Sequence, residues 1–141
     1  MLSSCFYSSF VFLCNILYAY CKDDYIYVAL FSFLFVTSVA FHANIEKETT
    51  LLLDKIPIVS IILYGGYAFY EKMIERNLTS FFDYLIPLLI VSTFVSTGYL
   101  YTYGYWTKQY CFYEDEVVAN YYHSALHVIS CVGHILIMFL E

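Results

Sequence analysis

The sequence predicts an all-α membrane protein, a bundle of about five transmembrane helices in a single domain spanning residues 1–141. Hydrophobic residues make up 62% of the chain and charged residues only 13%, roughly half the share usual in soluble domains. Five stretches approach the roughly 20 apolar residues that a helix needs to cross a bilayer. The 6 Lys and Arg against 12 Asp and Glu exclude a nucleic-acid-binding protein, because no basic surface can neutralise phosphates.

The first three predicted spans follow one another through short polar connections. Residues 4–20 form an apolar run that ends at the charged residues 22–24. We interpret this run as a retained span, because no basic segment precedes it as in a cleaved signal peptide. The second span covers residues 25–41 and ends at the polar residues 44–50, and the third covers residues 51–70.

An aromatic segment separates the last two predicted spans. The fourth covers residues 81–101 and contains Pro87, which either kinks the helix or is accommodated by neighbouring helices. Residues 102–113 are rich in Tyr and contain the only Trp of the chain. Such side chains favour the level of the lipid headgroups, so we expect an interfacial loop here. The fifth span begins near Val117 and runs to Leu140.

Ionisable side chains within the predicted spans are few. Because inserting such a side chain into lipid costs free energy, we first consider a functional role for each of them. His123 and His127 are four residues apart, so on a helix both rings project from one face about one turn apart. This spacing allows two imidazoles to bind one metal ion. His134 lies on the same face but too deep for that ion, and we interpret it as a core histidine. We expect Asp83 at the membrane edge.

The order of the spans brings three further polar residues to the same end of the bundle. Ser38 and His42 lie near the end of the second span, and Asp54 lies near the start of the third. With five alternating spans, the end of the second span, the start of the third and the start of the fifth all fall on the N-terminal side of the membrane. We therefore expect these three residues at the same depth as His123 and His127.

Three histidines with an open fourth position form the ligand set of a catalytic zinc site. We predict that His42, His123 and His127 bind Zn2+, that Ser38 hydrogen-bonds a water or a developing oxyanion, and that Asp54 transfers a proton to a leaving group. Simpler interpretations stay open for each residue. The histidines would then serve as interhelical or interfacial polar groups, Ser38 would bond its own helix backbone, and Asp54 would complement a helix N-terminus.

These residues resemble the motif of the alkaline ceramidase family, part of a superfamily of seven-span, zinc-dependent membrane hydrolases that includes adiponectin-type receptors. The superfamily pattern S-x-x-x-H, Asp and a late H-x-x-x-H is matched by Ser38 with His42, by Asp54, and by His123 with His127. Residues 52–58 (LLDKIPI) are similar to an LLDELPM-type segment of the family. The chain departs from the family in having room for about five spans, in a lysine directly after Asp54, and in lacking an acidic N-terminal segment that binds calcium, so we expect no calcium site.

The resemblance implies an intramembrane, zinc-dependent lipid amide hydrolase that cleaves ceramide to a sphingoid base and a fatty acid. It implies metal ligation by His42, His123 and His127, catalytic roles for Ser38 and Asp54, and a place in endoplasmic reticulum or Golgi membranes. Two alternatives stay open: hydrolysis of another acyl lipid, and a non-catalytic zinc-bearing receptor or scaffold. Whether two shortened bundles pair as a homo-oligomer to close a lipid pocket also stays open.

Overall fold

The described part of the chain is helical throughout its regular structure. The structure, a computed structural model, describes residues 3–43, 47–77 and 79–140, and these residues contain no strand. The elements are α1 (Ser4–Ser8), η1 (Ser9–Val11), α2 (Phe12–Cys21), α3 (Tyr25–His42), α4 (Lys47–Glu75), α5 (Phe81–Gly98), η2 (Tyr99–Tyr103), α6 (Gly104–Thr107), η3 (Tyr110–Phe112) and α7 (Glu116–Phe139). Five stretches of helix are long and apolar enough to cross a membrane. The predicted fold class is confirmed, and the chain is a multi-pass membrane protein.

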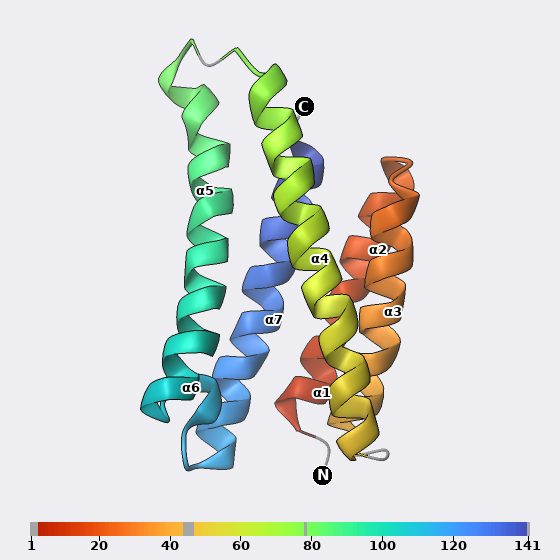
Figure 1. The fold of residues 1–141 in the computed structure, drawn as a ribbon, viewed down its shortest axis with the longest axis vertical. Coiled ribbons are helices and arrows are strands. Elements are labelled where there is room, and N and C mark those ends of the chain that lie inside the picture. The colour runs from red at the N-terminus through yellow and green to blue at the C-terminus, as the bar shows by residue number, and fades with distance from the viewer. Residues whose placement is uncertain (1–2, 44–46, 78, 141) are drawn as a thin grey trace.

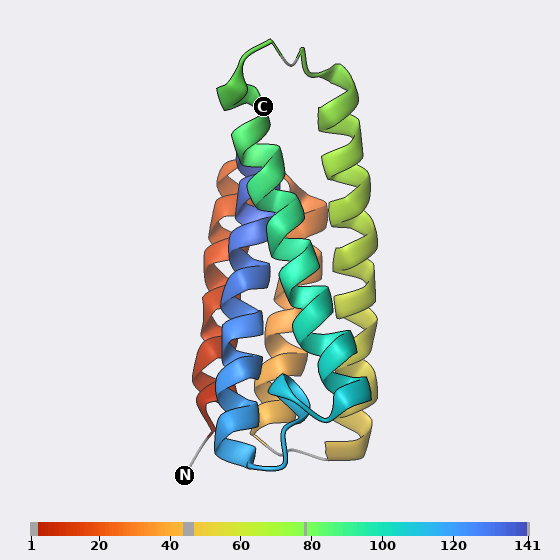
Figure 2. The same ribbon diagram turned by 90° about the vertical axis from the view of Figure 1, so that its left-hand side faces the viewer.

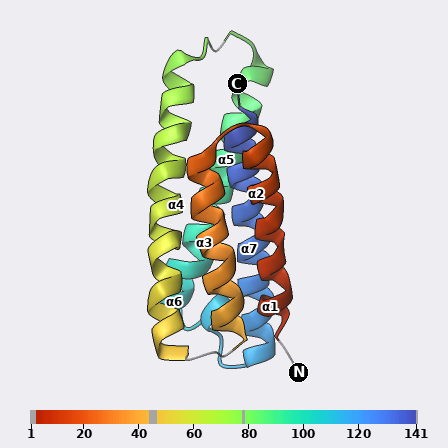
Figure 3. The same cartoon turned by 90° about the vertical axis from the view of Figure 1, so that its right-hand side faces the viewer.

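The long helical stretches lie side by side and alternate in direction, as Figure 1, Figure 2 and Figure 3 show. The first stretch comprises α1, η1 and α2, which follow one another without a break. The end of α3 and the starts of α4 and α7 lie at the same end of the bundle as α1. This is the arrangement that the order of the spans predicted for the candidate site.

Polar residues at helix starts explain why several helices begin where they do. The Asp24 carboxylate accepts a hydrogen bond from the backbone N–H of Tyr27 at 3.1 Å and caps α3. The Asp115 carboxylate accepts one from Val117 at 2.8 Å and caps α7. Ser80 and Asp83 form a capping box at the start of α5, the place where Asp83 was expected to mark the membrane edge. Each cap satisfies N–H groups that have no partner within the helix.

Two predicted boundaries differ from the structure. α4 runs from Lys47 to Glu75, longer at both ends than the predicted residues 51–70, because polar end residues continue the helix beyond its apolar centre. The predicted loop over residues 102–113 is helical as far as Thr107, through the π-helical turn η2 and α6. The chain then reverses at Lys108, which has a left-handed backbone with φ 56°. Residues 44–46, in the polar connection before α4, lie outside the described residues.

Two clusters of buried side chains hold the bundle together. The larger lies between α2, α3 and α4 and reaches the end of α7, and its fully buried centre includes Tyr27 and Phe31. The smaller joins α5 to α7 through Ile90 and Ile137. Among the described residues, the backbone of α5 comes close to α7 but not to α4. Large apolar side chains are exposed on the outer faces of the long helices, as a lipid environment requires.

Candidate metal centre

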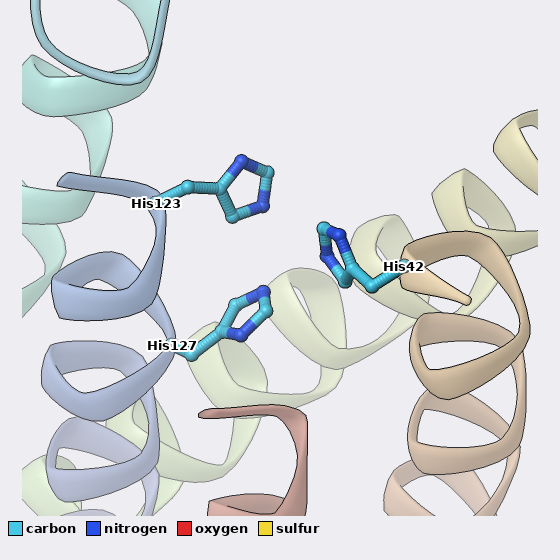
Figure 4. A group of neighbouring side chains, drawn as sticks. All are labelled: His42, His123 and His127. Carbon is cyan, nitrogen blue, oxygen red and sulfur yellow. The ribbon is translucent and has the colours of Figure 1, made fainter. Parts of the chain in front are cut away.

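Three histidines predicted to share a site meet at one end of the bundle. His42 is the last residue of α3, and His123 and His127 lie in the first half of α7. One ring nitrogen of each lies within 4.8 Å of one ring nitrogen of each of the others. Figure 4 shows the three rings pointing toward a common space from two separate helices. The structure therefore brings these three side chains together as the sequence predicted.

The rings are packed closely around that space. The ring centroids of His42 and His123 are 5.1 Å apart, those of His42 and His127 are 5.4 Å apart, and those of His123 and His127 are 4.9 Å apart. His127 is buried, whereas His42 and His123 are half-buried. The site is thus closed on the side of His127 and more open toward the end of the bundle.

The donor set suits a zinc ion. Imidazole nitrogens bind zinc at about 2.0–2.1 Å, so two of them on a tetrahedral ion lie about 3.4 Å apart. The three nitrogens, within 4.8 Å of one another, need only a small side-chain movement to reach that spacing. Three protein ligands leave one tetrahedral position for a water or a substrate, as in catalytic sites.

His127 has a hydrogen-bond partner that the sequence analysis did not identify. The hydroxyl of Ser8, the last residue of α1, lies 2.8 Å from Nδ1 of His127. The ring of Phe12 packs against the same imidazole with centroids 5.1 Å apart. The order of the spans indicates that Ser8, near the start of the first span, lies at the same end of the bundle as the histidines. It does not indicate which face of α1 is turned toward α7.

Ser38 lies one turn before His42 on α3, with its hydroxyl turned toward the first span. It is buried, and its Oγ lies 2.9 Å from Oγ of Ser9. Ser9 in turn donates to the backbone carbonyl of Cys5 at 2.8 Å. The hydrogen bond of Ser38 therefore goes to a neighbouring serine and not to an imidazole.

Asp54 is buried on α4 and faces α3. Its Oδ1 accepts a hydrogen bond from the Thr37 hydroxyl at 3.1 Å, and Thr37 precedes Ser38 in the chain. Within the described residues, this is the only hydrogen bond of the Asp54 carboxylate. The neighbouring Lys55 points elsewhere, because its ammonium group donates to the Tyr101 hydroxyl at 2.7 Å. The predicted catalytic roles of Ser38 and Asp54 stay predictions.

His134 lies deeper in the bundle, away from the three other histidines. It is buried, and its Nδ1 lies 2.9 Å from the hydroxyl of Tyr27 on α3. Gly65 on α4 allows this contact, because a Cβ there would lie 2.9 Å from the Tyr27 hydroxyl and closer still to the His134 ring. His134 is a core histidine, as predicted.

A cavity of about 270 Å³ lies between α4, α5 and α7. Its wall on α7 includes Leu126, next to His127, and continues down to His134. Its wall on the opposite side includes Phe94 and Thr97 of α5. The cavity thus lies beside α7 within the membrane-spanning part of the bundle, and its lining includes none of the three clustered histidines.

No known protein family, curated protein or solved structure matches this chain.

Proposed function

We propose that this protein is an intramembrane, zinc-dependent hydrolase of lipid amides, with ceramide as the substrate and a sphingoid base and a fatty acid as the products. The observation that carries the proposal is the convergence of His42, His123 and His127, whose ring nitrogens lie within 4.8 Å of one another in a membrane bundle. The resemblance to alkaline ceramidases at these residues supplies the substrate class.

The three histidines would hold the metal, and their arrangement leaves room for one further ligand. A zinc ion in such a site supplies a nucleophilic water at neutral pH and polarises a substrate carbonyl. The chain's own contribution is to fix the ligands. His123 and His127 are fixed relative to each other by their spacing on α7, whereas His42 depends on how α3 is packed against the rest of the bundle.

We assign the proton transfer to Asp54 and not to Ser38. Only Oδ1 accepts a hydrogen bond from Thr37, so within the described residues Oδ2 is available to take a proton and return it to the leaving amine. Burial excludes bulk water from this carboxylate, which strengthens its electrostatic interactions. Ser38 would have to release Ser9 before it could donate to an oxyanion.

The cavity between α4, α5 and α7 is evidence in favour of an apolar substrate. It adjoins the helix that carries two of the proposed ligands, and leucine, isoleucine and phenylalanine side chains form part of its wall. Side chains of α4, such as Phe69, pack against the cluster that joins α5 to α7, so the cavity lies between three helices that are in contact through their side chains. Walls of this kind discriminate only weakly between chain lengths.

The proposal includes a location and partners. The protein would act in endoplasmic reticulum or Golgi membranes, where the family resemblance places it, on a membrane lipid. A second copy of the chain would complete the lipid pocket. Another acyl lipid, such as a glycerolipid, is the nearest alternative substrate.

A second candidate function is a zinc-bearing membrane receptor or scaffold without catalysis. One observation favours it: the hydrogen bonds of Ser38 and Asp54 go to Ser9 and Thr37, and neither goes to an imidazole. In this case the metal would only tie α3 to α7.

Metal analysis and turnover together distinguish the two functions. We expect purified wild-type protein to contain about one zinc per chain and to release fatty acid from labelled ceramide. His127→Ala should lose both, whereas His134→Gln, which alters a histidine outside the site, should keep the zinc. Zinc without product from ceramide or glycerolipids would favour the scaffold. A wild-type protein that binds no zinc would exclude both functions.

A further inference from the structure

The structure assigns to Ser8 the task of fixing His127 for metal binding. We infer that the Ser8 hydroxyl oxygen accepts a hydrogen bond from the Nδ1–H group of His127, so that Nε2 carries the lone pair that binds the metal. This inference rests on the metal centre of the proposed function, and it adds the first span to the elements that form that metal centre. Ser8 is a positioning residue, because it acts on the metal through His127.

The hydrogen-bond geometry gives Ser8 this role. Its Oγ lies 2.8 Å from Nδ1 of His127 and 3.1 Å from the carbonyl oxygen of Cys5. A hydroxyl has one proton to donate and two lone pairs. When Ser8 donates that proton to the Cys5 carbonyl, its oxygen can only accept from His127, so Nδ1 must carry the hydrogen. A neutral imidazole has one N–H group, and Nε2 is then the metal-binding nitrogen.

Ser8 is the only hydrogen-bond partner of the His127 ring within the described residues. The ring also packs against the aromatic rings of Phe12, His42 and His123. His127 is 5% exposed, so water cannot readily replace a lost partner. Histidines that bind metals almost always donate their second N–H group to a neighbouring oxygen, which fixes the tautomer and the ring orientation. For His127, that oxygen belongs to Ser8.

The backbone of the first span explains how this contact arises. The α-helix α1 ends at Ser8 and is followed by the 3-10 turn η1, which begins at Ser9. The two adjacent hydroxyls both reach the Cys5 carbonyl, and they face different helices. Ser8 meets His127 on α7, and Ser9 meets Ser38 on α3. One turn of the first span thus contacts both helices that carry the proposed ligands.

The test compares zinc affinity in three variants of the full chain with that of the wild type. Ser8→Ala should raise the zinc Kd about 10–100-fold, the usual effect of losing such a partner of a ligating histidine. Ser8→Thr keeps the hydroxyl and should bind zinc within about threefold of wild type. Ser124→Ala is the matched control, because Ser124 also bonds across the contact between α1 and α7, to Ser4 at 3.1 Å, but forms no hydrogen bond with an imidazole among the described residues. It should leave the zinc Kd unchanged.

A spectroscopic measurement tests the tautomer without depending on affinity or activity. In metal-free wild-type protein with 15N-labelled histidine, nuclear magnetic resonance should show the proton of His127 on Nδ1, and Ser8→Ala should change the tautomer populations. A wild-type proton on Nε2 would overturn the inference even if Ser8→Ala does not fold.

The outcomes separate this inference from the function on which it rests. Zinc binding by wild type with an unchanged Kd in Ser8→Ala would overturn the role of Ser8 and leave the metal centre standing. Equal weakening by Ser8→Ala and Ser124→Ala would show a general packing effect and would also overturn it. A wild-type protein without zinc would remove the metal centre and the role of Ser8 together.

Discussion

His127 is held by contacts with the first span, whereas His42 lies at the end of a helix. His127 is buried and contacts Ser8 and Phe12 from the first span. His42 is the last residue of α3, directly before the connection to α4. Its position therefore depends on the register of a helix end, whereas the α7 pair is fixed by helix geometry. The metal affinity should accordingly be sensitive to changes at His42.

The first prediction concerns the contribution of His42 to zinc binding. His42→Ala should reduce the zinc content of purified protein from about one ion per chain to nearly none, because two imidazoles from one helix form an incomplete site. Zinc content measured by mass spectrometry of the purified variant checks this. His134→Gln is the control and should retain the metal, since His134 bonds Tyr27 outside the site. Retention of zinc by His42→Ala would place the metal elsewhere.

The second prediction separates proton transfer from metal binding at Asp54. Asp54→Asn keeps an oxygen that can accept from Thr37 but removes the carboxylate. We expect turnover of ceramide to fall by about 10²–10⁴-fold, the usual contribution of a general acid or base, with zinc content unchanged. Thr37→Val, which removes the same hydrogen bond and keeps the carboxylate, should have a smaller effect on turnover. Equal effects of the two variants would assign Asp54 a structural role only.

At the scale of elements, α5 is held to the bundle by its contact with α7. Gly133 on α7 permits this contact, because a Cβ at that position would overlap with the Thr93 side chain of α5. Ile90 and Ile137 are buried along the same line of contact. The α5–α7 contact therefore determines the width of the cavity between these helices and α4.

The third prediction tests this close approach of α5 and α7. Gly133→Ala should lower the free energy of unfolding by about 1–3 kcal/mol, the usual effect of adding a methyl group to a packed contact. Thermal or denaturant unfolding of the detergent-solubilised protein measures it. Gly66→Ala on α4 is the control, because a Cβ there meets open space, and it should not destabilise the protein. Combining Gly133→Ala with Thr93→Ala should recover stability, since the two residues are in contact.

The elements were largely predictable from the sequence, but the contacts between them were not. Apolar runs close to the bilayer thickness located all five spans, and their alternation placed His42 at the same end as His123 and His127. The hydropathy pattern did not show that α4 continues into polar residues at both ends. It did not reveal the contact of Ser8 with His127 either, because apolar residues surround the first helix on most sides and leave its rotation undetermined.

At the scale of the whole molecule, a metal at this site would join two helices, α3 and α7, whose backbones stay apart. Within the described residues, the backbones of α3 and α7 do not approach closely, and the first span packs against both. Their direct contacts run through side chains such as those of Tyr27 with His134 and of His42 with His123. A zinc ion would add bonds to both helices that exist only in the folded bundle.

The fourth prediction follows from this link between metal binding and folding. An ion that binds the folded state alone stabilises it by about 2.7 kcal/mol when its free concentration is one hundred times its Kd. For a chain of this size, that corresponds to a rise in Tm of about 5–10 °C. Thermal unfolding of wild-type protein should show this rise when zinc replaces a chelator, and the His42→Ala and His127→Ala variants should show none. A rise of equal size in the variants would mean that zinc acts at another place, and no rise in a wild type shown to hold one zinc would mean that the ion binds the unfolded chain equally well.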